Sequence, residues 1–208
     1  MVSIMLYVLL LAIFVVLKNN LDFLWNLEIK DPLQLNGQLQ LHGSAIIAKS
    51  GQGPFITHIT SGKIVDMGIK DANNMGAAMA PAALDTLLTH FKDTGRSPSY
   101  YDAIITGDLG HIGKDIVIDL CSRNGYNIKS VYNDCGVLIF DKEKQDTHSG
   151  GSGCGCCASV FSGYLFEQLK SKKIKRLLLI ATGALMNSMS SQQGESIPGI
   201  AHAISIEL

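Results

Sequence analysis

The feature that most constrains the fold is a short, unbroken apolar run near the C-terminus, residues 176–182 (RLLLIAT). A strand with one solvent-facing side alternates apolar and polar residues, whereas a strand covered on both faces is continuously apolar. Covering both faces of a sheet takes helices on each side of it. The run therefore predicts a layered α/β fold in which residues 176–182 form a central strand.

The chain from Gly43 onward alternates between strand-like and helix-like patterns. Helices are predicted at residues 81–93, 114–123 and 158–170, the first opening at Pro81 and ending at Gly95. Short apolar runs bounded by turn residues predict strands at residues 45–48, 101–106, 136–141 and 200–207. Residues 56–67 predict one or two further strands, with a turn at Ser61 and Gly62. This alternation implies right-handed crossovers, and the two adjacent final strands imply an antiparallel or mixed edge.

Composition and charge exclude several function classes. The 17 Lys and Arg residues against 18 Asp and Glu leave a net charge of −1, which removes the electrostatic case for a nucleic-acid-binding protein. Charged residues make up 17% of the chain and hydrophobic residues 47%, which favours heavy burial over disorder. Three of the five cysteines crowd into residues 154–157, a poor disulfide framework that suits a reducing compartment.

Residues 1–42 do not follow the α/β pattern. Residues 2–17 contain a single clearly polar side chain, Ser3, and as a helix they would span about 24 Å, slightly short of the ~30 Å hydrocarbon core of a bilayer. The run lacks the basic N-terminal region and the cleavage site of a signal peptide. A membrane anchor and a buried strand or helix both stay open for this run.

Candidate site residues lie at the ends of predicted strands, where ligands gather in open α/β sheets. Asp108, in the turn at residues 107–110 (GDLG), is suited either to a ligand hydrogen bond or to capping backbone amides. Asp134 has the same two interpretations, and the position of His111 favours a solvated helix start. His202, inside the last strand, is either a satisfied core histidine or a side chain that faces a cleft.

The least ordinary stretch is the glycine-rich segment 150–157 (GGSGCGCC), which precedes the third helix. Its backbone amides are suited to hold an anion or a carboxylate. A cysteine at a helix N-terminus is also a candidate nucleophile. The alternative is a tight glycine turn with small buried cysteines. Zinc is disfavoured, because no second cysteine pair accompanies the C-x-C-C spacing.

Several long strings in the chain together resemble the stage V sporulation protein AD family of spore-forming Firmicutes. They are residues 63–86 (KIVDMGIKDANNMGAAMAPAALDT), 101–110 (YDAIITGDLG), 133–140 (NDCGVLIF), 150–160 (GGSGCGCCASV), 177–186 (LLLIATGALM) and 195–202 (ESIPGIAH). The resemblance covers about residues 43–207. It implies a layered thiolase-like α/β sandwich of two related βαβαβαββ halves, of which only the second, C-terminal half is recognisable here, as a domain over residues 43–208.

The resemblance also implies a ligand-binding sporulation protein rather than an enzyme, with no catalytic residue, no metal site and no cofactor. The family binds dipicolinic acid, a planar pyridine dicarboxylate that travels with calcium. With other proteins of the stage V sporulation A operon it moves this acid into the forespore and out again on germination. A place in the spore, peripheral to its inner membrane, follows from this role. Nucleic acid is not an expected partner, and an oligomer stays open.

The resemblance assigns ligand-binding roles to residues of the second half. Asp134 is expected to orient a cationic His202 against a carboxylate of the ligand, and Asp108 falls where related condensing enzymes keep a histidine. The full expected set is Asp108, Asp134, Gly151, Gly153, Cys154 and His202.

Two other functions stay open from the sequence. One is a thiolase-like or ketoacyl-synthase-like acyltransferase that uses Cys154, and the other is a membrane-tethered structural fragment. The nucleophilic cysteine of the first half of condensing enzymes has no counterpart here, which argues against the acyltransferase and leaves the pocket open on one side. Read in a shifted frame, residues 1–42 are compatible with family-like sequence. We therefore hypothesise a frameshift, which the nucleotide sequence would test.

Overall fold

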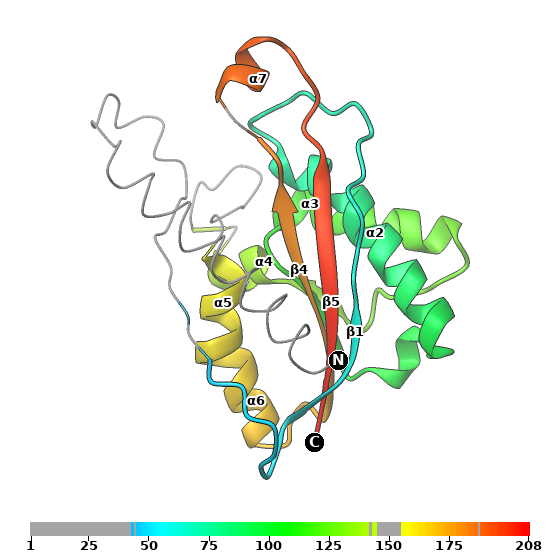
Figure 1. The fold of residues 1–208 in the computed structure, drawn as a ribbon, viewed down its shortest axis with the longest axis vertical. Helices are drawn as coiled ribbons and strands as arrows, with labels where there is room; N and C mark the ends of the chain where they lie inside the picture. Colours follow the sequence, from blue (N-terminus) through cyan, green and yellow to red (C-terminus); the bar gives the residue numbers. More distant parts are fainter. Residues whose placement is uncertain (1–42, 44, 142, 145–154, 187) are drawn as a thin grey trace.

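The computed structural model of the chain describes residues 43, 45–141, 143–144, 155–186 and 188–208. These residues form a mixed sheet with the strand order β1-β5-β4-β2-β3 (Figure 1). Both β3 and β4 pair with β2 in parallel, whereas β5 is antiparallel to β4 and to β1. The strands are β1 (Phe55–Thr60), β2 (Ala103–Thr106), β3 (Tyr132–Asp134), β4 (Arg176–Ala184) and β5 (Gly199–Glu207).

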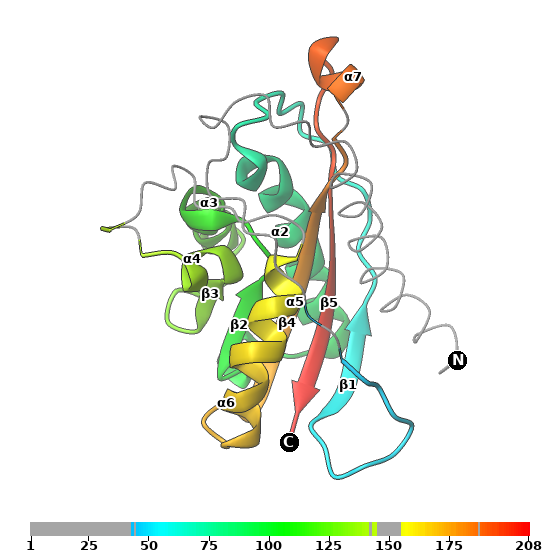
Figure 2. The same cartoon turned by 90° about the vertical axis from the view of Figure 1, so that its left-hand side faces the viewer.

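Helices cover both faces of this sheet (Figures 1 and 2). On one face lie α2 (Met75–Thr94) and α3 (Gly110–Arg123), which share a core with the strands beneath them. On the other lies one continuous helical stretch made of α5 (Cys156–Val160), the π-helical η3 (Phe161–Leu165) and α6 (Phe166–Lys170). The remaining short helices are η2 (Pro98–Tyr100), α4 (Cys135–Ile139) and α7 (Ser188–Gln192).

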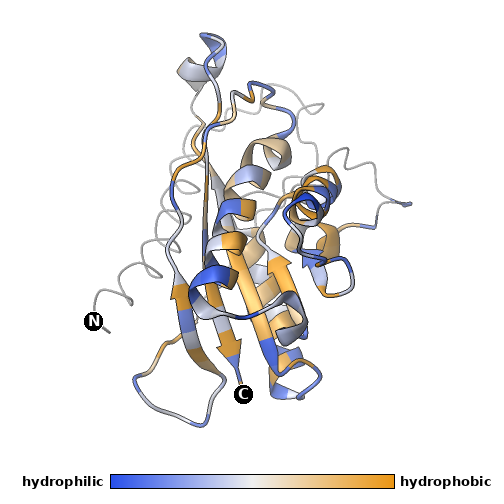
Figure 3. Ribbon diagram, turned by 90° about the vertical axis from the view of Figure 1, so that its right-hand side faces the viewer, coloured by the Kyte–Doolittle hydropathy of each residue, from blue (hydrophilic) through white to orange (hydrophobic). Residues whose placement is uncertain are grey.

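Strand β4 separates the two cores. Leu178 and Ile180 belong to the core under α2 and α3, and Leu177 and Leu179 to the core under α5 and α6. All four side chains are at most 6% exposed. Figure 3 shows the apolar colouring along the central strands. The predicted central strand and the layered α/β architecture are therefore confirmed.

The order of the main elements along the chain is βαβαβαββ, the order that the family resemblance implies. The sheet is mixed, as predicted, but its last strand is not at an edge. Strand β5 lies between β4 and β1, so that β1 forms the edge beside it. The antiparallel pairing of β4 with β5 runs from Arg176 opposite Glu207 to Ala184 opposite Gly199.

Two predicted strands are wrong. Residues 45–48 form no strand, because no neighbouring segment pairs with them, and Ile46 is 99% exposed. In the segment 136–141, most residues belong to helix α4, and the strand, β3, ends just before them. The Asp134 carboxylate accepts the Gly136 backbone N–H at 2.9 Å and so caps a helix where the apolar run predicted a strand.

The predicted helix at residues 81–93 starts earlier, at Met75, so Pro81 lies inside α2 instead of opening it. The Asn74 side chain caps the helix by accepting the Ala77 N–H at 3.2 Å. Gly76 packs against the backbone of Leu109, where a Cβ would collide with the carbonyl oxygen. The small residues before Pro81 are thus part of α2, and their size allows this helix to approach the start of α3 closely.

The predicted N-terminal segment 1–42, with its apolar run 2–17, lies outside the described residues. Its membrane-anchor and frameshift interpretations stay predictions. Among the helices of the described part of the chain, none has the length and apolar character of a membrane span.

Candidate functional site

The carboxyl ends of the parallel strands β2, β3 and β4 lie at one end of the sheet (Figure 2). Asp134 ends β3, and Asp108 lies two residues beyond β2. On β4, Thr182 packs against Gly107, where a Cβ would come within 2.9 Å of the Thr182 backbone nitrogen and side-chain oxygen. This end of the sheet is where the sequence predicts a ligand site.

Asp134 is fully buried and accepts four hydrogen bonds from its own chain. Its Oδ2 accepts from the Thr106 hydroxyl at 2.6 Å and from the Leu109 N–H at 2.8 Å. Its Oδ1 accepts the backbone N–H groups of Gly110 and Gly136, each at 2.9 Å. The carboxylate thereby joins the turn after β2 to the turn after β3, which confirms the capping interpretation of this residue.

The environment of Asp134 supplies neutral donors. Burial raises the pKa of this carboxyl, and the hydrogen bonds from Thr106, Leu109, Gly110 and Gly136 lower it without reversing the upward shift. The Thr106 hydroxyl also shares a 2.9 Å hydrogen bond with the buried hydroxyl of Tyr132. With its oxygens already occupied, Asp134 supports the backbone of the site, and a direct contact with a ligand stays a prediction.

His202 lies in the middle of β5 and is half-buried. Its Nδ1 accepts the Gly62 backbone N–H at 3.1 Å, which leaves the ring proton of the neutral imidazole on Nε2. Burial lowers the pKa of His202, which also favours the neutral ring. The expectation that Asp134 orients a cationic His202 is wrong. Two strands lie between them, and strand alternation places the two side chains on opposite faces of the sheet.

The face that carries His202 is the one that α5 covers. Ile204 and Ile206 alternate with it along the same side of β5 and pack in the core beneath α5 and α6. On the neighbouring strand its partner is Ala181, whose small side chain is half-buried. His202 therefore shares a face with the helix that follows the predicted glycine loop. Three residues of that loop lie outside the described residues and stay predictions: Gly151, Gly153 and Cys154.

Two buried polar atoms at this end of the sheet were not identified from the sequence. The Nε2 of His111 and the Oγ1 of Thr182 are shielded from solvent and have no hydrogen-bond partner among the described residues. The sequence predicts a solvated His111, but in the structure this residue is half-buried at the start of α3. The sequence feature that could have identified these two residues is their position, because each lies near the carboxyl end of a predicted strand. Asp108, in the same region, is half-buried and has an interaction partner.

The described cysteines near this face lack the histidine partner that acyl transfer by a thiol requires. Cys135 and Cys156 are fully buried and Cys157 is half-buried, and none of the three is in a disulfide bond. A hydrogen bond with Cys157, together with burial, holds the pKa of Cys135 well above its usual range. The hydrogen bonds of the described histidines go to threonine and tyrosine hydroxyls and to a backbone amide. The described residues thus show no Cys–His pair of the kind that a thiol enzyme uses.

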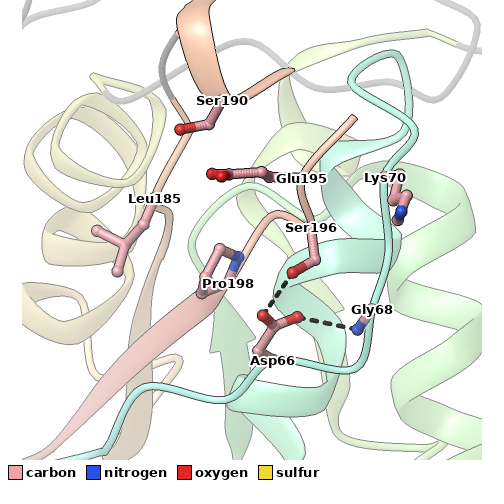
Figure 4. A pocket seen from close by; sticks show the side chains of 8 residues that line it. All are labelled: Asp66, Gly68, Lys70, Leu185, Ser190, Glu195, Ser196 and Pro198. Atoms are coloured by element: carbon pink, nitrogen blue, oxygen red, sulfur yellow. Dashed lines mark hydrogen bonds between the residues drawn. The ribbon is translucent and has the colours of Figure 1, made fainter. Parts of the chain in front are cut away.

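An open pocket of about 510 Å³ lies beyond the carboxyl end of β4, between residues 66–70 and the connection from β4 to β5 (Figure 4). On its floor Asp66 accepts the Ser196 hydroxyl at 2.6 Å and the Gly68 N–H at 2.9 Å. These two hydrogen bonds hold the pKa of Asp66 below its usual value. Lys70 and Glu195 also line the pocket, so its charges are mixed, and none of the residues expected to bind ligand lies in it.

The described residues contain no cluster of three or more His, Cys, Asp or Glu side chains arranged to hold a metal ion. The strongest oxygen donor at the carboxyl ends of the strands, Asp134, is already engaged by four donors. Hard cations such as calcium take six to eight oxygen ligands.

Comparisons with known proteins place this geometry in context. The family model described as Stage V sporulation protein AD matches residues 36–207. The chain is 44% identical over 165 residues to the Stage V sporulation protein AD of Bacillus subtilis (strain 168), which covers 79% of this chain and 48% of that protein. The chain thus spans about half the length of that relative. A solved structure, the 3-oxoacyl-[acyl-carrier-protein] synthase III of Aquifex aeolicus, is similar at 12% identity with a TM-score of 0.41, covering 76% of this chain and 46% of that one.

Proposed function

Because the chain belongs to the stage V sporulation protein AD family, and so is a sporulation protein, we propose that it binds dipicolinic acid instead of catalysing acyl transfer. In this role it supports uptake of the acid into the forespore and its release on germination. The observation that carries the proposal is the donor state of His202. Its Nδ1 is occupied by Gly62, so Nε2 presents an N–H on the face that α5 covers.

The chemistry of dipicolinate matches such a donor. A planar dianion needs hydrogen-bond donors for two carboxylates, and hydrogen bonds to charged acceptors are stronger than those between neutral groups. A neutral imidazole N–H supplies one donor without a buried positive charge. The backbone amides of Gly151 to Gly155 are proposed to supply others, because they precede the helix that lies on the same face as His202.

Acyl transfer is supported less well. It needs a nucleophile, a base within hydrogen-bond reach and an oxyanion hole. The hydrogen bond with Cys157, together with burial, raises the pKa of Cys135 and keeps it protonated, and the His202 nitrogen that would accept a proton already accepts the Gly62 N–H. These features favour a binding protein over an enzyme among the described residues.

The wider role is proposed with the family. Dipicolinate, alone or as its calcium chelate, and the other proteins of the stage V sporulation A operon are the proposed partners, with a location peripheral to the inner membrane of the spore. The net charge of −1 speaks against a nucleic-acid partner. Oligomerisation would supply the pocket wall that a relative of twice the length provides within one chain.

Calorimetric titration with dipicolinate tests the proposal. We expect the chain to bind it, and His202→Ala to weaken binding by about 1–3 kcal/mol, the loss of one hydrogen bond to a charged acceptor. His58→Ala is the matched control, because His58 is a half-buried histidine on β1 whose hydrogen bond is local, to the hydroxyl of the adjacent Thr57. Isophthalate, which keeps both carboxylates and lacks the ring nitrogen, measures how much the pyridine contributes.

Two outcomes of this titration would contradict the proposal. Equal losses in the His202 and His58 variants, or none in either, would assign His202 to the core and remove it from the site. If the longer relative binds dipicolinate and this chain releases no heat, the proposal fails for this chain.

A further inference from the structure

Three cysteines from two separate segments meet in the core beneath α5, and none of them is in a disulfide bond. Cys135 begins α4, and Cys156 and Cys157 begin α5, although α4 ends at Ile139 and α5 begins only at Cys156. Cys135 and Cys156 are 0% exposed, and Cys157 packs against the same core while remaining partly exposed. The Cys157 and Cys135 thiols are hydrogen-bonded to each other. The sequence shows a cysteine-rich run at 154–157, and only the fold adds Cys135 to it.

Among these thiols, Cys135 and Cys157 are the pair suited to react. Neighbouring residues on a helix do not face each other, which disfavours a bond between Cys156 and Cys157. Cys156 is shielded completely, so an oxidant in solution does not reach it first. Cys157 has exposed surface and a hydrogen-bonded thiol beside it, the arrangement of a reactive cysteine with a resolving partner.

We propose that Cys135 and Cys157 form a reversible disulfide in response to peroxide. The Cys157 sulfur attacks hydrogen peroxide, giving a sulfenic acid and one water. The Cys135 thiol then displaces the hydroxyl as a second water and closes the S–S bond. The two thiols are oxidised by two electrons in total, and the peroxide is reduced to water. A small thiol reverses the bond by exchange.

The order of these steps follows from the environment of each sulfur. A hydrogen bond with Cys157, and burial, keep Cys135 in its protonated form, so Cys135 acts as the resolving thiol and reacts second. The disulfide would join the end of β3 to the start of α5. Cys135 lies between Asp134 and Gly136, whose hydrogen bond caps α4, so oxidation would bear directly on the carboxyl ends of the strands.

Peptide mapping of the peroxide-treated chain tests the proposal. Trypsin releases Cys135 in the peptide 130–142. It releases Cys154, Cys156 and Cys157 together in the peptide 145–170. We expect the two peptides to appear cross-linked, with the loss of two hydrogens, and to separate again after dithiothreitol. Cys121, a buried thiol in the opposite core, is the internal control and should stay free in the peptide 115–123.

Serine variants assign the bond. Cys157→Ser should abolish the cross-link, whereas Cys156→Ser and Cys154→Ser should keep it at wild-type yield. Circular dichroism of each variant shows whether the fold is retained. A cross-link that survives Cys157→Ser, or its absence from the folded wild-type chain at peroxide levels that oxidise exposed methionines, would overturn the proposal.

Discussion

Each end of the sheet holds a carboxylate that is fully or mostly shielded from solvent, and different kinds of donor bind the two. Asp134 lies at the carboxyl ends of β2 and β3 and is held by backbone amides and a hydroxyl. Glu207 lies at the far end, because β5 runs antiparallel to its neighbours. It is held by a guanidinium: Arg96 Nη1 donates to Glu207 Oε1 at 2.7 Å, and both side chains are only 16% exposed.

The surroundings of Glu207 complete this ion pair. Tyr100 donates its hydroxyl to Oε2 at 2.9 Å, and Ser205 and Thr57 donate to Oε1. The Arg96 guanidinium also lies over the Tyr100 ring at 4.3 Å from its centroid. Burial alone would raise the pKa of Glu207, but the hydrogen bonds from Thr57, Tyr100, Ser205 and Arg96 lower it to about 2.

The comparison shows that burial does not decide the charge state of a carboxyl by itself. Neutral donors leave the pKa of Asp134 raised, whereas a cation and three hydroxyls reverse the effect of burial at Glu207. Asp134 organises loops near the candidate site, and Glu207 anchors the last strand away from it. Changes at the two ends should therefore have different consequences for stability and binding.

The largest effect is expected from Asp134→Ala. It leaves the N–H groups of Leu109, Gly110 and Gly136 without their acceptor inside the protein, and each unsatisfied buried donor costs about 1–3 kcal/mol. We expect a loss of about 3–5 kcal/mol in the free energy of unfolding, measured by urea denaturation. Asp134→Asn, which keeps one acceptor oxygen, should lose less than half as much. Equal urea midpoints for the alanine variant and wild type would refute the capping role.

Arg96→Met should come next. It leaves the Glu207 carboxylate mostly buried without its cation, and breaking such a pair typically costs about 3 kcal/mol. Arg96→Lys is the control that restores the charge without the planar fork, and it should recover part of the loss. The same urea titration measures both. Dipicolinate affinity corrected for unfolding should not change in either variant, and a specific loss of binding would contradict the separation of the two ends.

The pH dependence of stability should show two windows. His90 is fully buried between the Thr60 hydroxyl at 2.7 Å and the Tyr101 hydroxyl at 2.6 Å. Burial, and to a smaller extent the nearby His58 and Arg96, lower the pKa of His90 to about 4, although Asp93 raises it slightly. The neutral histidine therefore stabilises fully above pH ~6.5, and this contribution of about 2–3 kcal/mol is lost as the pH falls through 4.

The second window belongs to Glu207 at lower pH. Its pKa is lowered to about 2, so its contribution is complete above pH ~4.5 and is lost as the pH falls through 2. Asp134 acts in the opposite sense, because a raised pKa favours the folded state at acid pH. Thermal melts from pH 7 to 2 check this, with His90→Gln removing the upper window and Glu207→Gln the lower. A single acid transition unchanged by both variants would refute it.

The smallest effect is expected where the same chemistry is exposed. Arg123 pairs with Asp119 at 2.8 Å on the surface of α3, with side chains 72% and 56% exposed. Solvent and salt screen such a pair, so Arg123→Ala should change the free energy of unfolding by less than about 0.5 kcal/mol. A loss as large as that of Arg96→Met would mean that burial does not set the difference between these pairs.

Sequence patterns identified those elements whose own apolar residues show which of their faces are buried. The continuous apolar run of β4 and the stripe that covers the sheet from 158 to 170 are examples, and both are confirmed. The patterns failed where a short apolar run suits either a helix or a strand. At residues 136–141 the choice depends on the Asp134 cap, and at 45–48 on the lack of a neighbouring strand.

The candidate site shows the same difference between features that a local pattern predicts and features that depend on distant segments. The sequence by itself determined which residues end strands, so that Asp134, Asp108 and the glycine loop could be named from local position. Only the tertiary structure decided that Asp134 and His202 lie on opposite faces, that Cys135 lies beside Cys157, and that Glu207 pairs with Arg96. The physical reason is that strand pairing and side-chain contacts join segments far apart in sequence, up to 150 residues for Thr57 and Glu207. A local pattern records what each residue buries but carries no information about which segment covers it.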